Sequence, residues 1–170
     1  MTKVNEVYLC GTLIWQDGLI ISQVTNRLYE HKVDYVGNAS AVGALWDVQD
    51  RVYVPYTIAL QTNAEPYGLT INYEKAVDGA GVASQMKRAG ELTLALVGNL
   101  GEFHWNYKDS SGQSHSGTVT LEDINAQLPD LVTLYNQLYG TDWEPLASVK
   151  DYAASPATLQ QLVELLGMPH

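Results

Sequence analysis

Apolar and polar residues alternate over much of the first two-thirds of the chain, a pattern typical of β-strands with one buried face. The clearest strand is predicted at residues 51–61, where one face at a period of two carries Val52, Val54, Tyr56, Ile58 and Leu60. Pro55 has no N–H to donate to a neighbouring strand, so this strand is expected to lie at a sheet edge or to be kinked there. A second alternating strand is predicted at residues 69–73.

A β-hairpin is predicted at residues 103–119. Aromatic residues alternate with polar ones from Phe103 to Lys108, and the Asp-Ser-Ser-Gly segment at 109–112 supplies a reversal. A four-residue loop would place Asn106 opposite His115, because residues paired across two strands share a face. His104, Asn106 and His115 would then lie on one face of the hairpin, with the aromatic residues on the other.

Other segments of this part are less sharply patterned. Residues 4–15 are predicted as a strand, and residues 20–28 favour a helix capped by Asp17, although a hairpin arm would also suit them. Residues 38–47 could form a short helix or a loop. Residues 92–97 are mostly apolar and are predicted as a buried strand.

The last third of the chain changes to the helical period of about 3.6 residues. Thr120 stands three residues before Asp123, a spacing typical of a helix N-terminus. Pro129 is expected to restart this helix, because proline is tolerated in a first turn. The apolar stripe of this region comprises Leu128, Leu131, Leu134, Tyr135 and Leu138.

A final helix is predicted to begin at Ser155-Pro156 and to end at Gly167. Its apolar stripe comprises Leu159, Leu162, Val163 and Leu166. This stripe could face the protein core or another molecule, since either would bury similar apolar area at ~25 cal/mol per Å².

Strands followed by helices predict an α+β fold. We expect a single domain over residues 1–170, with an antiparallel, β-rich part at 1–119 and a helical segment at 120–167. Two or three C-terminal helices would pack on one face of the sheet.

Composition narrows the classes of partner. The chain carries 19 acidic and 9 basic residues, which gives a formal net charge of −10. Nucleic-acid binding needs clustered Lys and Arg, so this scarcity of basic residues argues against it. The hydrophobic content of 46% is too high for a disordered chain.

Targeting signals are not apparent at the N-terminus. It lacks the apolar run of about 7–15 residues that a signal peptide needs, and no run approaches the ~18 apolar residues of a membrane span. We therefore expect a cytoplasmic protein without membrane contact, or one exported without a cleaved signal. The single cysteine, Cys10, lies in an apolar segment and is expected to be a buried, inert thiol.

Catalytic motifs are sparse. The chain has no Gly-x-Ser-x-Gly, and the glycine-rich residues 78–83 lack the Gly-Lys-Ser/Thr of a phosphate-binding loop. His104 and His115 could share a metal, but a stable site needs three or four ligands. We therefore predict no metal and no cofactor, and the sequence favours a non-catalytic role over an enzyme.

Aromatic residues near acids suggest a binding surface. Trp46, Tyr67 and Trp143 stand in or beside predicted loops, and tyrosine and tryptophan are prominent at protein interfaces. The neighbouring acidic residues are Asp47, Asp50, Glu65, Asp142 and Glu144. An acidic rim with aromatic anchors would suit a basic protein partner.

Three functional hypotheses follow. The first is an acidic interaction protein that binds, and neutralises, a basic protein, as an inhibitor or immunity-type factor would. The second is a structural component of a self-assembling or phage-type particle, which requires self-association. The third is a small-molecule-binding protein or enzyme with a pocket between sheet and helices, in which His104, Asn106 and His115 are the residues to test.

Overall fold

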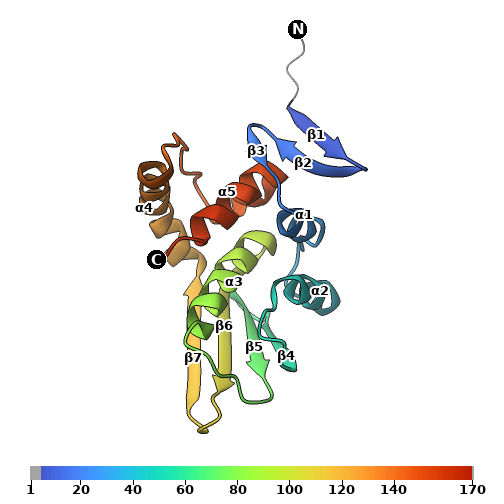
Figure 1. Cartoon of the computed structure of the whole chain (residues 1–170). Coiled ribbons are helices and arrows are strands. Elements are labelled where there is room, and N and C mark those ends of the chain that lie inside the picture. Colours follow the sequence, from blue (N-terminus) through green and yellow to red (C-terminus); the bar gives the residue numbers. More distant parts are fainter. Residues whose placement is uncertain (1–4, 170) are drawn as a thin grey trace.

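The computed structural model describes residues 5–169, over which two sheets and a set of helices form an α+β fold, as predicted (Figure 1). In chain order the elements are β1 (Glu6–Leu9), β2 (Thr12–Gln16), β3 (Leu19–Ile20), α1 (Gln23–Glu30), α2 (Ala39–Gln49), β4 (Tyr56–Gln61), β5 (Tyr67–Tyr73), α3 (Val82–Leu96), β6 (Leu100–Lys108), β7 (Ser114–Thr120), α4 (Leu121–Tyr139), the 3-10 helix η1 (Val149–Ala154) and α5 (Pro156–Leu166). Val4, the start of the predicted first strand, lies outside the described residues. Residues 1–3, which belong to the N-terminus considered for a signal peptide, also lie outside them.

The main sheet has the strand order β4-β5-β6-β7. β4 pairs with β5 and β6 with β7 in antiparallel fashion, whereas β5 and β6 run parallel. Parallel neighbours need a crossover connection, and α3 provides it. The sheet is therefore mixed rather than wholly antiparallel. β4 lies at its edge, one of the two outcomes expected from Pro55, but the prediction of a strand from residue 51 is wrong. The strand begins only at Tyr56, directly after the proline, and Val52 and Val54 lie outside it.

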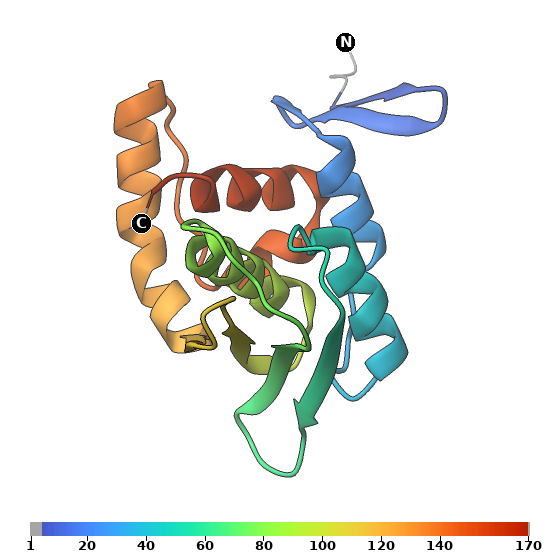
Figure 2. The same ribbon diagram turned by 60° about the horizontal axis from the view of Figure 1, so that its bottom comes forward.

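One face of this sheet packs against α3. The inward side chains Leu69, Ile71 and Phe103 have no solvent exposure. Gly90 allows α3 to approach closely, because a Cβ at this position would lie 2.5 Å from the Phe103 ring and 2.8 Å from Val119. In Figure 2, α5 lies beyond α3 from the sheet, with α4 on one side and α1 and α2 on the other.

The segment at residues 1–119, which is predicted to be β-rich, contains the three helices α1, α2 and α3. Residues 92–97 are the end of α3 and not a strand. A short apolar run does not distinguish a buried strand from a buried helix, and α3 is covered by the sheet on one side and by η1 and α5 on the other. Of the two alternatives for residues 38–47, a short helix or a loop, the helix is correct, because α2 begins at Ala39 and includes the rest of this segment.

Both interpretations of residues 20–28, a helix and a hairpin arm, are partly right. Leu19–Ile20 forms the last arm of a small sheet with β1 and β2, and α1 follows directly. The helix is capped by Ser22 and not by Asp17, because the Ser22 hydroxyl accepts a hydrogen bond of 3.1 Å from the Thr25 N–H.

The small sheet projects from the body of the protein (Figure 1). Gln16 ties it to α5 by accepting a 2.9 Å hydrogen bond from the Ala157 N–H. Cys10 lies in the turn between β1 and β2 with a φ of 49°, and it is exposed. The prediction that this thiol is buried is wrong, because the chain reverses there instead of continuing as one strand.

Helix α4 runs through Pro129 without a restart. Its N-cap is Thr120, as predicted, and its buried positions include Leu128 and Leu131. Leu134 and Leu138 are exposed, so the predicted stripe is only partly buried. Packing of the buried positions outweighs the roughly 3 kcal/mol that proline costs inside a helix.

The apolar stripe of α5 faces the core. Leu159, Leu162 and Leu166 each have 0% exposure, and Val163 is half-buried at the edge of the stripe. These three leucines therefore pack in the protein core and are not available to another molecule. Within residues 5–169, no helix combines the length and the apolar character needed to cross a bilayer.

Truncation of this stripe should destabilise the fold. We expect Leu162→Ala to lower the free energy of unfolding by about 2–5 kcal/mol, since it removes buried methyl groups and leaves a cavity. Leu138→Ala, at a position 61% exposed, should change it by no more than about 0.5 kcal/mol. Urea denaturation of both variants measures the difference. Equal small effects would contradict the core assignment.

Candidate functional site

The three aromatic residues of the predicted protein-binding surface do not form one surface. Trp46 is 1% exposed and packs in the core against Phe103, with ring centroids 5.3 Å apart. Trp143 stacks on Tyr135 of α4 at 4.3 Å. Tyr67 begins β5 and is half-buried. Since α2 and α4 flank α3 on opposite sides, these aromatic residues serve separate parts of the core (Figures 1 and 2).

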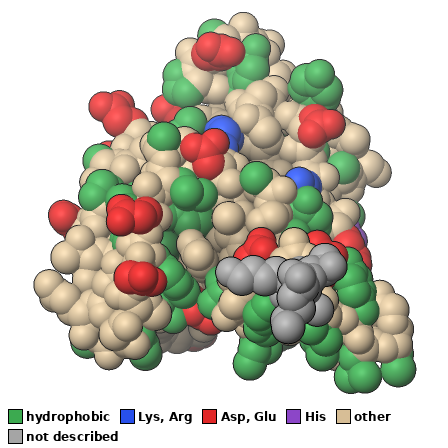
Figure 3. All heavy atoms as spheres, turned by 90° about the horizontal axis from the view of Figure 1, so that it is seen from above, with side chains coloured by type: hydrophobic (Ala, Val, Ile, Leu, Met, Phe, Trp, Pro, Cys, Tyr) green, Lys and Arg blue, Asp and Glu red, His purple; other side chains and the backbone are tan. Residues whose placement is uncertain are grey.

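The acidic residues of that surface are also dispersed. Asp47 and Asp50 lie at the end of α2, Glu65 lies in the β4–β5 loop, and Asp142 and Glu144 follow α4. Asp47 accepts a hydrogen bond from the Tyr56 hydroxyl. On the face drawn in Figure 3, Asp and Glu side chains are scattered and do not gather into one patch.

The hairpin register differs by one residue from the prediction. His115 pairs with Tyr107, and Asn106 pairs with Ser116. His115 therefore lies on the aromatic face, where its ring stacks on Tyr107 at 4.8 Å. The prediction that His115 shares a face with His104 and Asn106 is wrong, because a shift of one residue turns every side chain to the other face.

Gly117 explains this register. It lies opposite Trp105, and a Cβ at this position would come within 2.0 Å of the indole ring. The larger side chain occupies the space that the glycine leaves open. Only the observed pairing places a residue without a side chain against this tryptophan.

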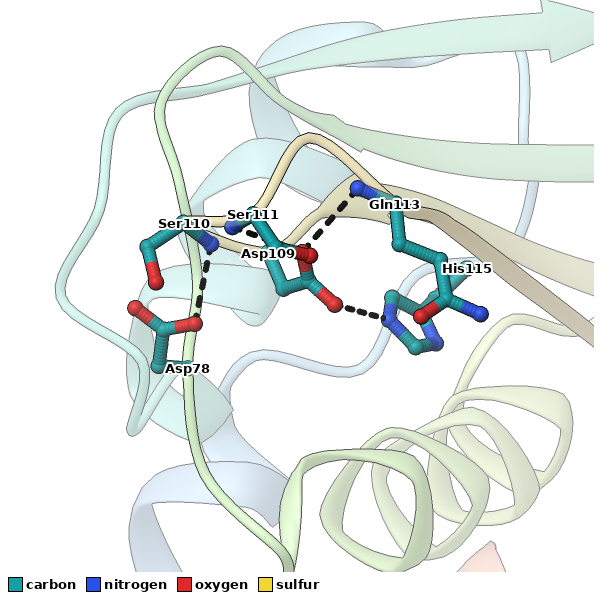
Figure 4. A network of polar contacts seen from close by, with 6 residues as sticks. All are labelled: Asp78, Asp109, Ser110, Ser111, Gln113 and His115. Atoms are coloured by element: carbon teal, nitrogen blue, oxygen red, sulfur yellow. Dashed lines mark hydrogen bonds and ion pairs between the residues drawn. The ribbon is translucent and has the colours of Figure 1, made fainter.

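The reversal of the hairpin is held by Asp109 (Figure 4). Its Oδ1 accepts hydrogen bonds from the N–H groups of Ser111 and Gln113, each at 3.0 Å, and its Oδ2 lies 2.9 Å from His115 Nε2. The hydrogen bond with His115 and that with Ser111 hold the pKa of Asp109 well below its usual range. The Asp109 carboxylate is therefore engaged within the turn on both of its oxygens.

His104 and Asn106 lie on the opposite, solvent-facing side of the sheet. His104 bridges Glu102, at 3.1 Å from Nε2, and Thr118, at 2.8 Å from Nδ1. Asn106 donates to the Asn72 side chain at 2.8 Å. Across residues 5–169, no group of three or more His, Cys, Asp and Glu side chains is placed to hold a metal ion.

A pocket that the sequence did not reveal lies between α1, α2, α3 and α5. Its volume is about 210 Å³. Most of its wall is apolar and includes Leu28, Trp46, Val48, Met86, Leu92 and Val163. Its polar wall residues are Gln49, Asp50, Arg51, Gln85 and Arg88. An apolar enclosure with a few convergent polar groups is the usual form of a small-ligand site.

Two buried polar atoms of this wall have no hydrogen-bond partner within the described residues: Trp46 Nε1 and Gln49 Oε1. The Gln49 amide is oriented by its other end, because its Nε2 donates to Thr93 Oγ1 at 2.9 Å while that hydroxyl donates to the Ala89 carbonyl. The Trp46 N–H lies close enough to the Tyr73 hydroxyl to oppose the rise of its pKa, but without hydrogen-bond geometry.

The Tyr73 hydroxyl anchors the polar side of the pocket. It donates to Asp50 Oδ1 at 3.0 Å, and the same oxygen accepts the Val52 N–H at 3.0 Å. Burial first, and then the Asp50 charge, raise the pKa of Tyr73. The phenol therefore stays protonated, and Asp50 Oδ1 already has two donors.

Comparison with known proteins places the core of the chain in a family. Residues 28–120 match the family described as a domain of unknown function, DUF4825, and they make up more than half of the chain. The chain belongs to this family. No curated protein and no solved structure matches it. The DUF4825 segment contains α2, the main sheet and α3, and with them most of the pocket wall.

The turn of the DUF4825 hairpin should weaken in acid. Because the folded pKa of Asp109 lies below its ordinary 3.8, its contribution to stability is present above that pH and is lost as the pH falls further. We expect the protection factors of the Ser111 and Gln113 amides, which compare each exchange rate with its intrinsic rate at the same pH, to fall progressively as the pH drops from about 4 toward the depressed pKa of Asp109. Asp109→Ala should show the lower protection already at neutral pH. Asp78→Ala, which removes the hydrogen bond to the Ser110 N–H, is the control; equal protection of these amides in all three proteins would contradict this role.

The buried tyrosines of the protein should resist phenol ionisation. Burial is the main reason for the raised pKa values of Tyr56, Tyr73, Tyr135 and Tyr152. The unfolded chain loses these protons near pH 10, so the stabilising effect is complete below that pH and is lost above it. Phenolate absorbance of the folded protein should rise at higher pH than that of the protein in urea. Coincident titration curves would show that these tyrosines are solvated.

Proposed function

We propose that this DUF4825 protein binds a small molecule in the pocket between α1, α2, α3 and α5. The observation that carries the proposal is the apolar wall that contains an acceptor without a hydrogen-bond partner, Gln49 Oε1, and a donor, Trp46 Nε1, whose polar neighbour, the Tyr73 hydroxyl, lies outside hydrogen-bond geometry. A buried polar group without a partner costs about 1–3 kcal/mol, so each such group in a folded protein requires a reason. A ligand that supplies the missing partners is such a reason.

The size of the pocket limits the ligand. A cavity of about 150 Å³ lined by apolar side chains holds benzene. This pocket has about 210 Å³, enough for one aromatic ring or a branched aliphatic group with a few polar atoms. The Trp46 Nε1 and Gln49 Oε1 atoms are shielded from water, so a ligand that pairs with them has to displace wall side chains.

The hypothesis of a basic protein partner rests on the net charge of −10 and stays a prediction. The residues that were to form its surface lie on separate elements, which is why the pocket carries the proposal. His104, Asn106 and His115 do not line this pocket, so they are not part of the proposed site.

A leucine that fills the pocket should abolish binding. Ala89 lines the pocket from α3, whereas Ala83 lies exposed on the same helix and outside the wall. We use p-cresol as the probe, since its ring fits the cavity and its hydroxyl both donates and accepts. Ala89→Leu should weaken p-cresol binding by at least about tenfold, because the added side chain occupies the apolar space. Ala83→Leu should bind it as the wild type does.

Binding is measured by tryptophan fluorescence and by the NMR shift of the Met86 methyl group, which lies in the wall. Denaturation midpoints of the two variants confirm that both are folded. If p-cresol leaves the Met86 methyl signal unchanged, or binds Ala89→Leu as tightly as wild type, the pocket is not a ligand site.

A further inference from the structure

We propose that the ligand is an amphipathic anion, with an apolar body inside the pocket and a carboxylate or similar group held at its mouth by Arg51 and Arg88. This inference rests on the proposed function and specifies the ligand class. Both arginines line the pocket and both are exposed, so their guanidinium groups stand where the cavity meets solvent.

Arg51 is held in place by the end of α2. Its Nη1 donates to the carbonyls of Val48 at 3.0 Å and Asp50 at 3.1 Å. Within residues 5–169, its Nη2 and Nε make no hydrogen bond, so one edge of the guanidinium is oriented while the rest remains available. Preorganised guanidinium groups suit carboxylates, because their donors match the two oxygens of the anion.

Arg88 supplies the second positive charge from α3. Among the described residues it forms no ion pair or hydrogen bond, and it lines the same pocket as Arg51. The chain has only 9 basic residues, so two at the mouth of one small pocket are a local departure from its acidic character.

The local charge balance favours an anion. Asp50 is the only carboxylate in the described pocket wall, and its Oδ1 already accepts from Tyr73 and Val52. Two arginines against one engaged carboxylate give the wall a net positive charge. Screening at physiological ionic strength acts over about 8 Å, so these charges outweigh the distant acidic residues of the chain.

A cationic ligand is the main competitor. Aromatic rings such as those of Trp46 and Tyr73, together with Asp50, are the groups that recognise ammonium ions. The engagement of Asp50 Oδ1 and the repulsion from two arginines disfavour this alternative. Ligands that share one phenyl group and differ in charge separate the two classes.

The test uses the full chain and calorimetric titration with phenylacetate, phenylacetamide and phenethylamine. We expect phenylacetate to bind wild type at least about tenfold more tightly than phenylacetamide, as a charge-assisted interaction with an arginine would give. Arg88→Gln should reduce this preference, and Arg51→Gln/Arg88→Gln should remove it. Arg27→Gln, an exposed position on α1 outside the wall, makes the same change in net charge as Arg88→Gln and should leave the preference intact.

The possible results distinguish the two proposals. Equal affinity for the acid and the amide, with both lost in Ala89→Leu, would overturn the anion inference and support the pocket. Tighter binding of phenethylamine would overturn it in favour of a cation at Asp50. Binding that Ala89→Leu leaves unchanged would overturn the proposed function itself. Because Arg88 makes no hydrogen bond or ion pair among the described residues, a loss of preference in an Arg88→Gln variant with an unchanged denaturation midpoint reflects the ligand and not misfolding.

Discussion

The close packing of α3 on the main sheet is the constraint on which the rest of the fold depends. Gly90 brings the helix within contact of Phe103 and Val119, and any larger residue would hold the two layers apart. The opposite side of α3 is covered by η1 and α5. Lys150 of η1 secures the end of the helix by donating to the carbonyls of Leu94 at 2.7 Å and Val97 at 2.8 Å. Burial of this amine lowers the pKa of Lys150 to about 8.

The pocket forms where this packing stops. Met86, Ala89 and Leu92 of α3 line a space whose other walls are provided by α1, α2 and α5 through Leu28, Trp46 and Val163. These side chains come from helices that approach from different directions, so they enclose space without filling it. An apolar cavity lacks the dispersion contacts that a filled core would have, and a ligand of matching shape would supply them.

The polar clusters of the protein fall into two kinds. At the hairpin turn, Asp109 accepts from Ser111 and Gln113 and pairs with His115, so both of its oxygens already have partners. At the pocket, the hydrogen bonds of Gln49 and Tyr73 leave Gln49 Oε1 and Trp46 Nε1 without partners. Candidate sites chosen for their residue types, such as the histidines of the hairpin, belong to the first kind. The pocket with the unsatisfied groups is formed by residue types, such as Trp46 and Gln49, that usually have structural roles in proteins.

The sequence by itself determined the α+β class, the hairpin at 103–119 and the helical final third, because each depends on local periodicity. It did not determine the nature of residues 92–97, since an apolar run is compatible with a buried helix or a buried strand. Tertiary packing decided this, and it decided the hairpin register through the contact of Gly117 with Trp105. It also decided the pocket, whose wall joins residues from Leu28 to Val163 and has no signature along the chain. Local patterns report which side of an element is buried, whereas only the assembled helices determine which buried side chains leave space between them.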